Sequence, residues 1–344
     1  MTETTLVPVR DLTATIEEIL ANAGLGRPHA AAVARIIAAG ERDGSKSHGI
    51  HRIDMCLSAI KAGTVELTAE PKLNDDGGTI VRIDAAGGFS SLASEMGAPV
   101  LAERARQHGL AAMVINDCVH FSALWPEIEM LTERGIAALS MCPSYAAVAP
   151  HGGSEPLLGT NPIAFGWPRQ DKPPFVFDFA TSMVARGEIE LYRRAGDPLP
   201  DGWAIDAEGQ PTNRPEDALA GALLPFGAHK GSAISIMVEL LAGAMIGDLT
   251  SKGVIEELGS MALAPRHGEL VIAMDPARFA AGRDRDPFER AEALFDAITG
   301  QGARLPAQRR FAARAQAEQE GIPLTDEELA RLERYRTLGV RALD

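Results

Sequence analysis

The chain has 344 residues, of which 46% are hydrophobic and 23% are charged, a composition typical of a soluble globular protein. Its formal net charge of −14 argues against nucleic acid as a partner, because a phosphate backbone attracts basic surfaces. The three cysteines are isolated from one another, which argues against a disulfide framework or a zinc knuckle and favours a reducing cytoplasm.

No membrane segment is indicated. The first residues, Met1–Thr5, lack a basic region and an apolar run, so no signal peptide is expected. The most apolar run, Ala233–Ile246, is too short to cross a bilayer and contains Glu239. It is therefore expected to be a buried helix.

The first sixty residues predict helices. Apolar residues at helical spacing give the ranges Leu12–Ala23, Ala30–Gly44 and Gly49–Ala62. Ser47 stands where it would cap the third helix, which would place His48 and Arg52 on one face. Such a pair could hold a carboxylate on Arg52 and pass a proton from His48 to a neighbouring atom. The simpler alternative is a solvated helix end.

The middle and the end of the chain alternate between strands and helices. The expected strands are Thr79–Ile83, Ala111–Ile115, Ala137–Met141, Phe175–Phe179 and Glu269–Met274. The expected helices are Leu92–His108, Ser122–Arg134, Ala233–Ile246, Pro287–Thr299 and Thr325–Tyr335. The strand–helix–strand order around Ser122–Arg134 predicts an α/β layer. Asp201–Arg214, rich in Gly, Pro, Asp and Asn, is expected to be a loop.

The common nucleotide-binding loops are absent from the sequence. There is no G-x-G-x-x-G after a strand and no G-x-x-x-x-G-K-[ST], so an ordinary Rossmann site or P-loop is not indicated. The stretch Leu224–Ser232 places small residues and Lys230 at the start of an apolar helix, where backbone N–H groups could bind a phosphate. A plain helix start capped by Ser232 is the open alternative.

Two strand ends and one turn are further candidates. His120 follows a buried strand, where α/β folds place ligand groups, although a packed histidine beside Phe121 and Trp125 is the alternative. Gly159–Pro162 indicates a turn, and Asp178–Ser182 ends a strand with polar groups. An ordinary surface turn and a helix cap are their simpler interpretations.

Arg304, Arg309 and Arg310 form a basic patch in an acidic chain. Such a patch could bind the 2′-phosphate that distinguishes NADP from NAD, because guanidinium groups match phosphate geometry. A solvated surface cluster is the alternative.

Four motifs occur in a fixed order: Ser-His-Gly-x-x-Arg (Ser47–Arg52), Gly-Thr-Asn-Pro (Gly159–Pro162), Phe-Asp-x-Ala-Thr-Ser (Phe177–Ser182) and Gly-x-x-Lys-Gly (Gly227–Gly231). Together they resemble the malate/L-lactate dehydrogenase-like oxidoreductases, which lack a Rossmann domain, over about residues 12–311. A narrower similarity to the Δ1-piperideine-2-carboxylate/Δ1-pyrroline-2-carboxylate reductases lies in His120–Pro126, Pro150–Gly152 and Leu223–Ser232.

The resemblance implies an α/β fold with a central cofactor domain on a largely antiparallel sheet, flanked by helical parts from both termini. It predicts three parts: a helical and substrate-binding part at residues 1–120, an NADP-binding domain at 121–300, and a helical segment at 301–344 that packs back on the first part. It also implies a homodimer with the active site near the subunit boundary.

The implied activity is reduction of a cyclic imino acid with NADPH, or with NADH, and without a metal. Δ1-pyrroline-2-carboxylate would give L-proline, and Δ1-piperideine-2-carboxylate would give L-pipecolate. A second hypothesis is a 2-hydroxy acid dehydrogenase of the malate, lactate or ureidoglycolate type. A third, a non-catalytic binding protein of the same fold, is opposed by the intact set Ser47, His48, Arg52, Thr160 and Glu188.

The resemblance also assigns catalytic roles. His48 resembles the proton donor, and Ser47 and Glu188 resemble the groups that orient and tune it. We expect a pKa of His48 near its ordinary value of about 6.5, with the Glu188 carboxylate favouring the protonated form. Such a histidine can give a proton at neutral pH.

Substrate and cofactor contacts follow from the same resemblance. Arg52 and Thr160 resemble the groups that hold the substrate carboxylate, with Arg186 and Gly187 in the same pocket. The expected cofactor contacts are His120, Phe121, Ser122, Ala123, Leu124, Asp178, Phe179, Ala180, His229, Lys230, Arg304, Arg309 and Arg310.

Overall fold

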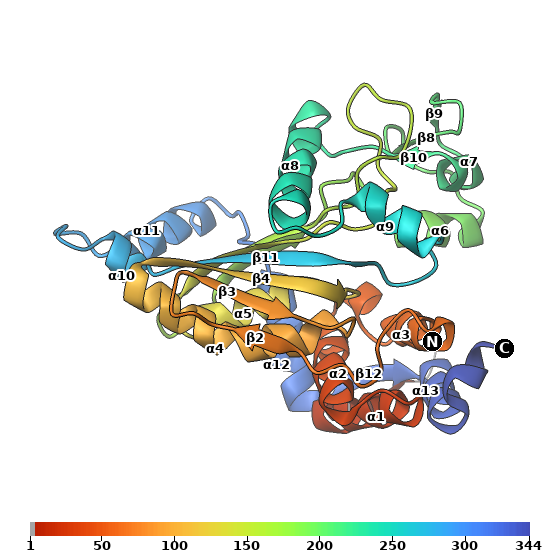
Figure 1. Cartoon of the computed structure of the whole chain (residues 1–344), viewed down its shortest axis with the longest axis horizontal. Helices are drawn as coiled ribbons and strands as arrows, with labels where there is room; N and C mark the ends of the chain where they lie inside the picture. Colours follow the sequence, from red (N-terminus) through yellow and green to blue (C-terminus); the bar gives the residue numbers. More distant parts are fainter. Residues whose placement is uncertain (1–3) are drawn as a thin grey trace.

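A seven-stranded sheet forms the centre of the molecule (Figure 1). The computed structural model describes residues 4–344, so the first three residues of the segment Met1–Thr5 lie outside it. In sheet order the strands are β2 (Lys72–Asn74), β3 (Ile80–Asp84), β4 (Leu110–Val119), β11 (Arg266–Met274), β5 (Ala137–Met141), β6 (Ile163–Trp167) and β7 (Phe175–Phe179). Only β3 and β4 pair in parallel, so the predicted largely antiparallel sheet is confirmed.

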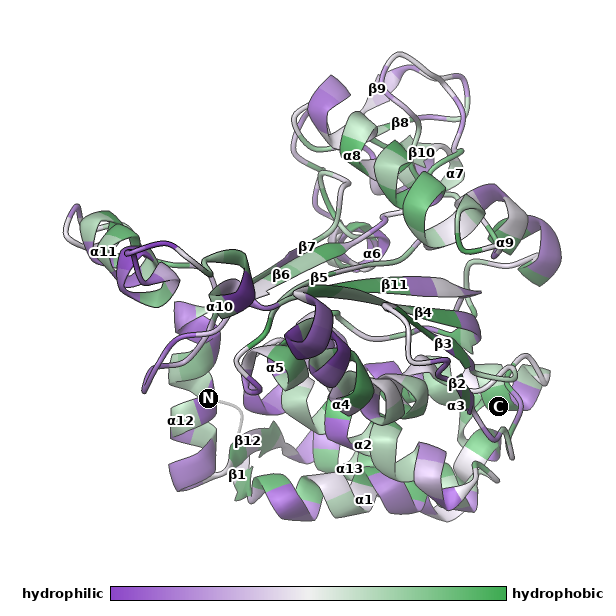
Figure 2. Cartoon of the chain, turned by 60° about the vertical axis from the view of Figure 1, so that its left-hand side comes forward, coloured by the Kyte–Doolittle hydropathy of each residue, from purple (hydrophilic) through white to green (hydrophobic). Residues whose placement is uncertain are grey.

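The two longest strands explain why the sheet is the core. β4 and β11 pair over most of their length, and most residues of both strands are buried. A strand that is covered on both faces needs apolar side chains in both directions, which accounts for the continuous apolar runs in the sequence. Figure 2 shows this hydrophobic colour along the central strands.

One face of the sheet is covered by helices from the middle of the chain and from both ends (Figure 1). These helices are α1 (Val9–Asn22), α2 (Arg27–Arg42), α3 (Arg52–Ala62), α4 (Ser90–His108), α5 (Trp125–Thr132), α12 (Gln308–Glu320) and α13 (Asp326–Leu338). The short strands β1 (Thr4–Val7) and β12 (Ile322–Thr325) pair antiparallel and join the two ends. Helical parts from both termini therefore flank the sheet, as predicted, whereas the exact division into three parts stays a prediction.

The other face carries a smaller lobe (Figures 1 and 2). It contains α6 (Arg186–Ala195), α7 (Pro215–Ala220), α8 (His229–Glu239), the π-helix η2 (Leu240–Ala244), α9 (Ser251–Leu258) and a sheet of β8 (Ala204–Ile205), β9 (Pro211–Thr212) and β10 (Ala222–Leu223). The remaining elements are the 3-10 helices η1 (Lys46–His48) and η3 (Gly339–Leu343) and the helices α10 (Pro276–Phe279) and α11 (Pro287–Thr299). Across residues 4–344, no helix is long and apolar enough to cross a membrane.

Three local predictions are wrong. The expected loop Asp201–Arg214 contains the hairpin β8–β9. The helix expected over Ser122–Arg134 begins only at Trp125, because the Asp178 carboxylate accepts hydrogen bonds from the backbone N–H groups of Leu124 and Trp125 at its start. Ser232 is not a cap, since α8 already begins at His229.

The predicted helix over Gly49–Ala62 is also shorter than expected. His48 belongs to η1, whereas Arg52 is the first residue of α3, so the two side chains do not share one helix face. Ser47 does not cap α3, whose N-cap position is occupied by His51. The break follows Gly49, whose backbone angles (φ −90°, ψ −140°) are not helical.

Candidate active site

The segment that carries His48 is held close against α2. A Cβ at Gly40 would collide with the His48 carbonyl oxygen, so only glycine allows this approach. A Cβ at Gly49 would lie 2.6 Å from atoms of the Glu41 side chain. The same carboxylate accepts a hydrogen bond from the backbone N–H of Ile50, at 3.2 Å. The glycine of the Ser-His-Gly motif therefore serves to seat the histidine.

The His48 imidazole has two close partners. Ser47 Oγ lies 3.1 Å from its Nδ1 atom. The Trp125 indole meets it edge to face, with ring centroids 5.8 Å apart and an interplanar angle of 80°. Burial, and then the charge of Arg52, lower the pKa of His48 to about 3. This value lies below the expected pKa near 6.5, because partial removal of the ring from water and the neighbouring cation both disfavour a second positive charge.

Arg52 is a half-buried cation without a carboxylate partner among residues 4–344. Its Nη1 atom contacts only the Met55 sulfur, at 3.7 Å, and its buried Nε–H group has no acceptor. A guanidinium that is partly removed from water and has no counter-ion is costly. The Arg52 guanidinium is therefore suited to bind the carboxylate of a small molecule.

The first turn of α6 approaches this region only in part. Arg186 donates a hydrogen bond to the Leu219 carbonyl at 3.0 Å. Gly187 and Glu188 are exposed, and in the described part of the chain Glu188 makes no hydrogen bond with His48. The expectation that Glu188 raises the pKa of His48 finds no support within the described chain, where the charge that acts on this ring is that of Arg52.

The Gly-Thr-Asn-Pro segment is not the expected turn but an irregular, largely buried junction directly before β6. Asn161, fully buried, donates to Ser235 Oγ at 2.9 Å and to the Glu239 carboxylate at 2.7 Å. The Thr160 carbonyl accepts hydrogen bonds from the backbone N–H and the hydroxyl of Thr181, at 2.8 and 3.1 Å. Two of the ordered motifs are thereby joined across 21 positions of sequence.

The expected cofactor residues on β7 and α8 lie near each other. Phe179 packs edge to face against Phe226, with centroids 5.7 Å apart, directly before the exposed pair His229 and Lys230. The carbonyl of Thr181, close to Ala180, accepts from the Phe226 N–H at 3.0 Å. The structure thus brings these two expected contact segments together.

The segment after β4 is mostly buried. His120, Phe121, Ser122, Ala123 and Leu124 are all at most 9% exposed, and Phe121 packs edge to face on Phe89. The alternative of a packed histidine agrees with the burial of His120, which is 5% exposed.

Behind His120 lies a buried polar cluster. The ligand-type atoms of His120, Cys142 and His267 lie within 4.8 Å of one another, as do those of His120, Glu127 and Glu269. These groups could hold a metal ion. Burial raises the pKa of both Glu127 and Glu269, which favours neutral carboxyl groups that need no cation. The absence of a metal stays a prediction.

The basic patch of the C-terminal segment faces a cavity of about 810 Å³. Arg304, Arg309 and Arg310 line it together with Ser45, which lies three residues before His48. Arg304 and Arg309 are exposed and form no ion pair with any residue from 4 to 344. They are therefore free to meet an anion.

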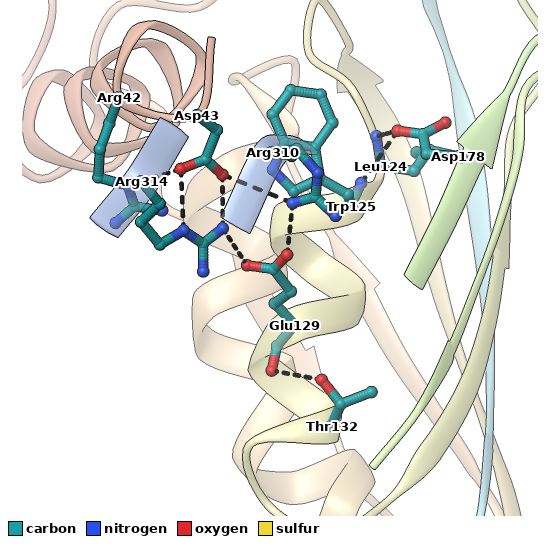
Figure 3. Close-up of polar contacts among 9 residues, drawn as sticks. All are labelled: Arg42, Asp43, Leu124, Trp125, Glu129, Thr132, Asp178, Arg310 and Arg314. Atoms are coloured by element: carbon teal, nitrogen blue, oxygen red, sulfur yellow. Dashed lines mark hydrogen bonds and ion pairs between the residues drawn. The ribbon is translucent and has the colours of Figure 1, made fainter. Parts of the chain in front are cut away.

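Arg310 is engaged differently, in the network of Figure 3. Its guanidinium donates to the Glu129 carboxylate at 2.5 Å, and Arg314 bridges Glu129 and Asp43 at 2.7 and 2.5 Å. The Arg310 guanidinium carbon also lies 4.9 Å from the centre of the Trp125 ring. Burial would raise the pKa of Asp43, but hydrogen bonds from Arg314 and Arg42 outweigh it and hold the pKa below its ordinary value.

Comparison with known proteins decides the family. The family described as malate/L-lactate dehydrogenase matches residues 7–333. The chain belongs to this family. It is 60% identical to the Δ1-pyrroline-2-carboxylate reductase of Agrobacterium fabrum, over the whole of both chains. It is 52% identical to the Δ1-pyrroline-2-carboxylate/Δ1-piperideine-2-carboxylate reductase of Pseudomonas aeruginosa, over 95% of this chain and 97% of that protein.

A solved structure agrees with this membership. The Δ1-piperideine-2-carboxylate reductase of Pseudomonas syringae pv. tomato superposes with a TM-score of 0.92 at 40% identity, over 96% of this chain and all of that chain. The predicted malate/L-lactate dehydrogenase-like fold is confirmed. The family roles of the individual residues stay predictions.

Several residues of this family member escaped the sequence analysis. Burial raises the pKa of Tyr145, while the charges of Arg186 and Arg52 act in the opposite direction, so the tyrosine lies in the field of both arginines. In the sequence, Tyr145 is marked only by its position four residues after the strand β5. Asp43, Glu129 and Arg314 carry no motif, because their contacts join segments far apart in sequence.

Proposed function

We propose that this protein reduces cyclic imino acids with NADPH, converting Δ1-pyrroline-2-carboxylate to L-proline and Δ1-piperideine-2-carboxylate to L-pipecolate. The observation that carries this is the unpaired Arg52 guanidinium beside His48. Full-length relatives named for this activity support it. The 2-hydroxy acid dehydrogenase alternative has less support, and a non-catalytic protein has least.

Arg52 is the proposed anchor for the substrate carboxylate. Its planar guanidinium can form two parallel hydrogen bonds with a carboxylate and so fix the orientation of the ring. Thr160, Arg186 and Gly187 are proposed to complete the pocket. The Tyr145 ring, in the field of Arg52 and Arg186, is suited to form one of its walls.

His48 is the proposed proton donor to the ring nitrogen. If the Ser47 hydroxyl donates to Nδ1, across the observed 3.1 Å, the neutral ring carries its hydrogen on Nε2. Ser47 would then set which nitrogen faces the substrate. Glu188 remains a proposed tuning group.

The lowered pKa of His48 supports a proposal for when this residue takes up the proton that it would donate. The ring is neutral while Arg52 is unpaired, since the pKa of His48 is lowered to about 3 by burial and by that charge. A carboxylate bound to Arg52 offsets the like charge and raises this pKa. Substrate binding would therefore favour proton uptake at the site of the reaction.

The residues around the 810 Å³ cavity fit nicotinamide adenine dinucleotide phosphate (NADPH). When bound, this cofactor supplies the hydride that reduces the C=N bond. Arg304 and Arg309 are proposed to hold its 2′-phosphate, and Arg310 links the cavity wall to Trp125 and hence to His48. The segments His120–Leu124, Asp178–Ala180 and His229–Lys230 are the other proposed contacts.

The preference for NADPH over NADH can be tested on this cavity. We expect Arg304→Ala with Arg309→Ala to raise KM for NADPH and to leave KM for NADH nearly unchanged. Arg283→Ala, at another exposed arginine, serves as the control. Equal effects on both cofactors would assign the two arginines to something other than the 2′-phosphate.

A homodimer in the cytoplasm completes the proposal. Ile236, Leu240 and Met245, along α8 and the π-helix that follows it, are 43%, 57% and 62% exposed. Exposed apolar residues in one stretch favour a covered surface. Light scattering of the purified protein measures the assembly, and Leu240→Glu is expected to shift it toward monomer.

The activity itself is tested by following NADPH oxidation with Δ1-pyrroline-2-carboxylate, Δ1-piperideine-2-carboxylate, pyruvate and oxaloacetate. We expect turnover with the two imines. Turnover with the oxo acids alone would instead establish the hydroxy acid dehydrogenase.

A further inference from the structure

Trp125 lies against both His48 and Arg310. Its buried indole lies edge to face with His48, with centroids 5.8 Å apart. The guanidinium carbon of Arg310 lies 4.9 Å from the centre of the same ring. One side chain therefore connects the proposed proton donor with the network of α12.

Both the backbone and the ring of Trp125 are held by neighbouring residues. The Asp178 carboxylate accepts from the backbone N–H groups of Leu124 and Trp125, at 2.8 and 3.1 Å (Figure 3). Arg310, which lies over the ring, is in turn fixed by Glu129. Trp125 has little freedom to move.

His48, by contrast, has few restraints of its own. It ends a 3-10 helix of three residues, and its imidazole has one hydrogen-bonding partner in the described chain, Ser47 Oγ. The charged or titratable groups that act on it or respond to it are Arg52 at the start of α3 and His120 after β4. Neither of these is a packing surface for the ring.

We propose that Trp125 is the positioning residue for His48: its indole, clamped by Arg310, fixes the orientation of the imidazole and keeps water from it. This inference rests on the proposed role of His48 as proton donor. It assigns a task to the tryptophan of the His120–Pro126 motif. A proton donor that must lie within hydrogen-bond reach of one ring nitrogen needs such a support.

The expected effect separates positioning from simple stability. Trp125→Leu should lower kcat about 10- to 100-fold, because a small misplacement of a reacting group costs on this scale. KM for the imine should change less, since Arg52 is untouched. Water admitted to His48 should move the pH profile of kcat toward higher pH, because burial is the main cause of the lowered pKa.

Trp203 provides a matched control. It packs edge to face with Tyr192, with centroids 5.6 Å apart and an interplanar angle of 78°, in the smaller lobe. Trp203→Phe should leave kcat and its pH profile unchanged. Trp125→Phe keeps an aromatic ring and should lie between Trp125→Leu and the unaltered enzyme in both readouts.

Fluorescence gives a readout that does not depend on turnover. With Trp167→Phe and Trp203→Phe, Trp125 is the only tryptophan left of three. His48→Gln in this background should change its emission.

Two results would overturn the inference: an unchanged emission, or a Trp125→Leu enzyme with normal kcat and normal pH profile. If Trp125→Leu does not fold, Trp125→Phe decides by the same two kinetic measurements. If His48→Gln itself turns over normally, the role of His48 fails instead, and the inference falls with it. The reductase activity would still stand.

Discussion

Half-buried arginines meet two opposite environments in this protein. Arg310 and Arg314 on α12 are paired with Asp43 and Glu129, whose side chains are 0% and 8% exposed. Arg52 contacts a methionine sulfur and no carboxylate among residues 4–344. The paired cations are neutralised within the chain and join its two ends to α5. The unpaired cation remains available for the proposed substrate carboxylate, so the two environments suit different tasks, one in holding the fold and one in binding a ligand.

The largest effect is expected beside the unpaired Arg52, when the proposed proton donor His48 is removed. We expect His48→Gln to lower turnover of the imine by about 10²–10⁴-fold, the usual contribution of general acid catalysis. Affinity for NADPH, measured by fluorescence titration, should change little. Near-normal turnover would remove His48 from the mechanism.

Among the paired residues, Asp43 is the carboxylate whose loss is expected to lower the stability most, because it contacts both Arg310 and Arg314. Asp43→Asn leaves the charges of Arg310 and Arg314 under-compensated, and we expect a loss of about 3–5 kcal/mol in the free energy of unfolding. Because the native pKa of Asp43 is lowered, the loss should be present at neutral pH and shrink below the ordinary pKa of about 4, where the native enzyme also loses the contribution.

Urea denaturation measures this change. Asp75→Asn, at the more exposed pair with Arg104, is the control and should shift the midpoint much less. Equal shifts would mean that burial of the network adds nothing.

A matched pair of arginine variants sharpens the comparison. Arg52→Lys should raise KM for the imine roughly 10- to 100-fold, since lysine loses one charge-assisted hydrogen bond worth about 1.5–3 kcal/mol. Arg314→Lys should lower the melting temperature and leave KM unchanged. If both variants change the same quantity, the two arginines do not differ in function.

The smallest expected effect is in the pH dependence. As the proposed proton donor, His48 must be protonated to act, so we expect the reductive rate to fall as the pH rises through its pKa. The profile of kcat/KM reports the free enzyme, where burial and Arg52 keep this pKa low. The profile of kcat reports the substrate complex, where a bound carboxylate offsets Arg52. We expect the apparent pKa from kcat to be higher by about 1 or more. Equal values would show that Arg52 and His48 are not coupled.

Local sequence determines a large part of this protein. The mostly buried strands β4, β5 and β11 are apolar runs, and their approximate positions follow from the sequence because a strand covered on both faces tolerates few polar residues. The ordered motifs led to the family, which the comparisons confirm. The capping box of Thr325 and Glu328 likewise marks the start of α13 through contacts three residues apart.

Tertiary structure alone decided the state of the charged side chains. The pKa of His48 depends on burial by the folded chain, and Arg314 meets Asp43 across 271 positions of sequence. The sequence presents Arg304, Arg309 and Arg310 as one basic patch, and all three line the cavity, yet the fold pairs Arg310 with Glu129 and gives the other two no ion pair among residues 4–344. Helical and strand periodicity record which residues are buried, whereas the partner of a charge depends on long-range contacts that no local pattern contains.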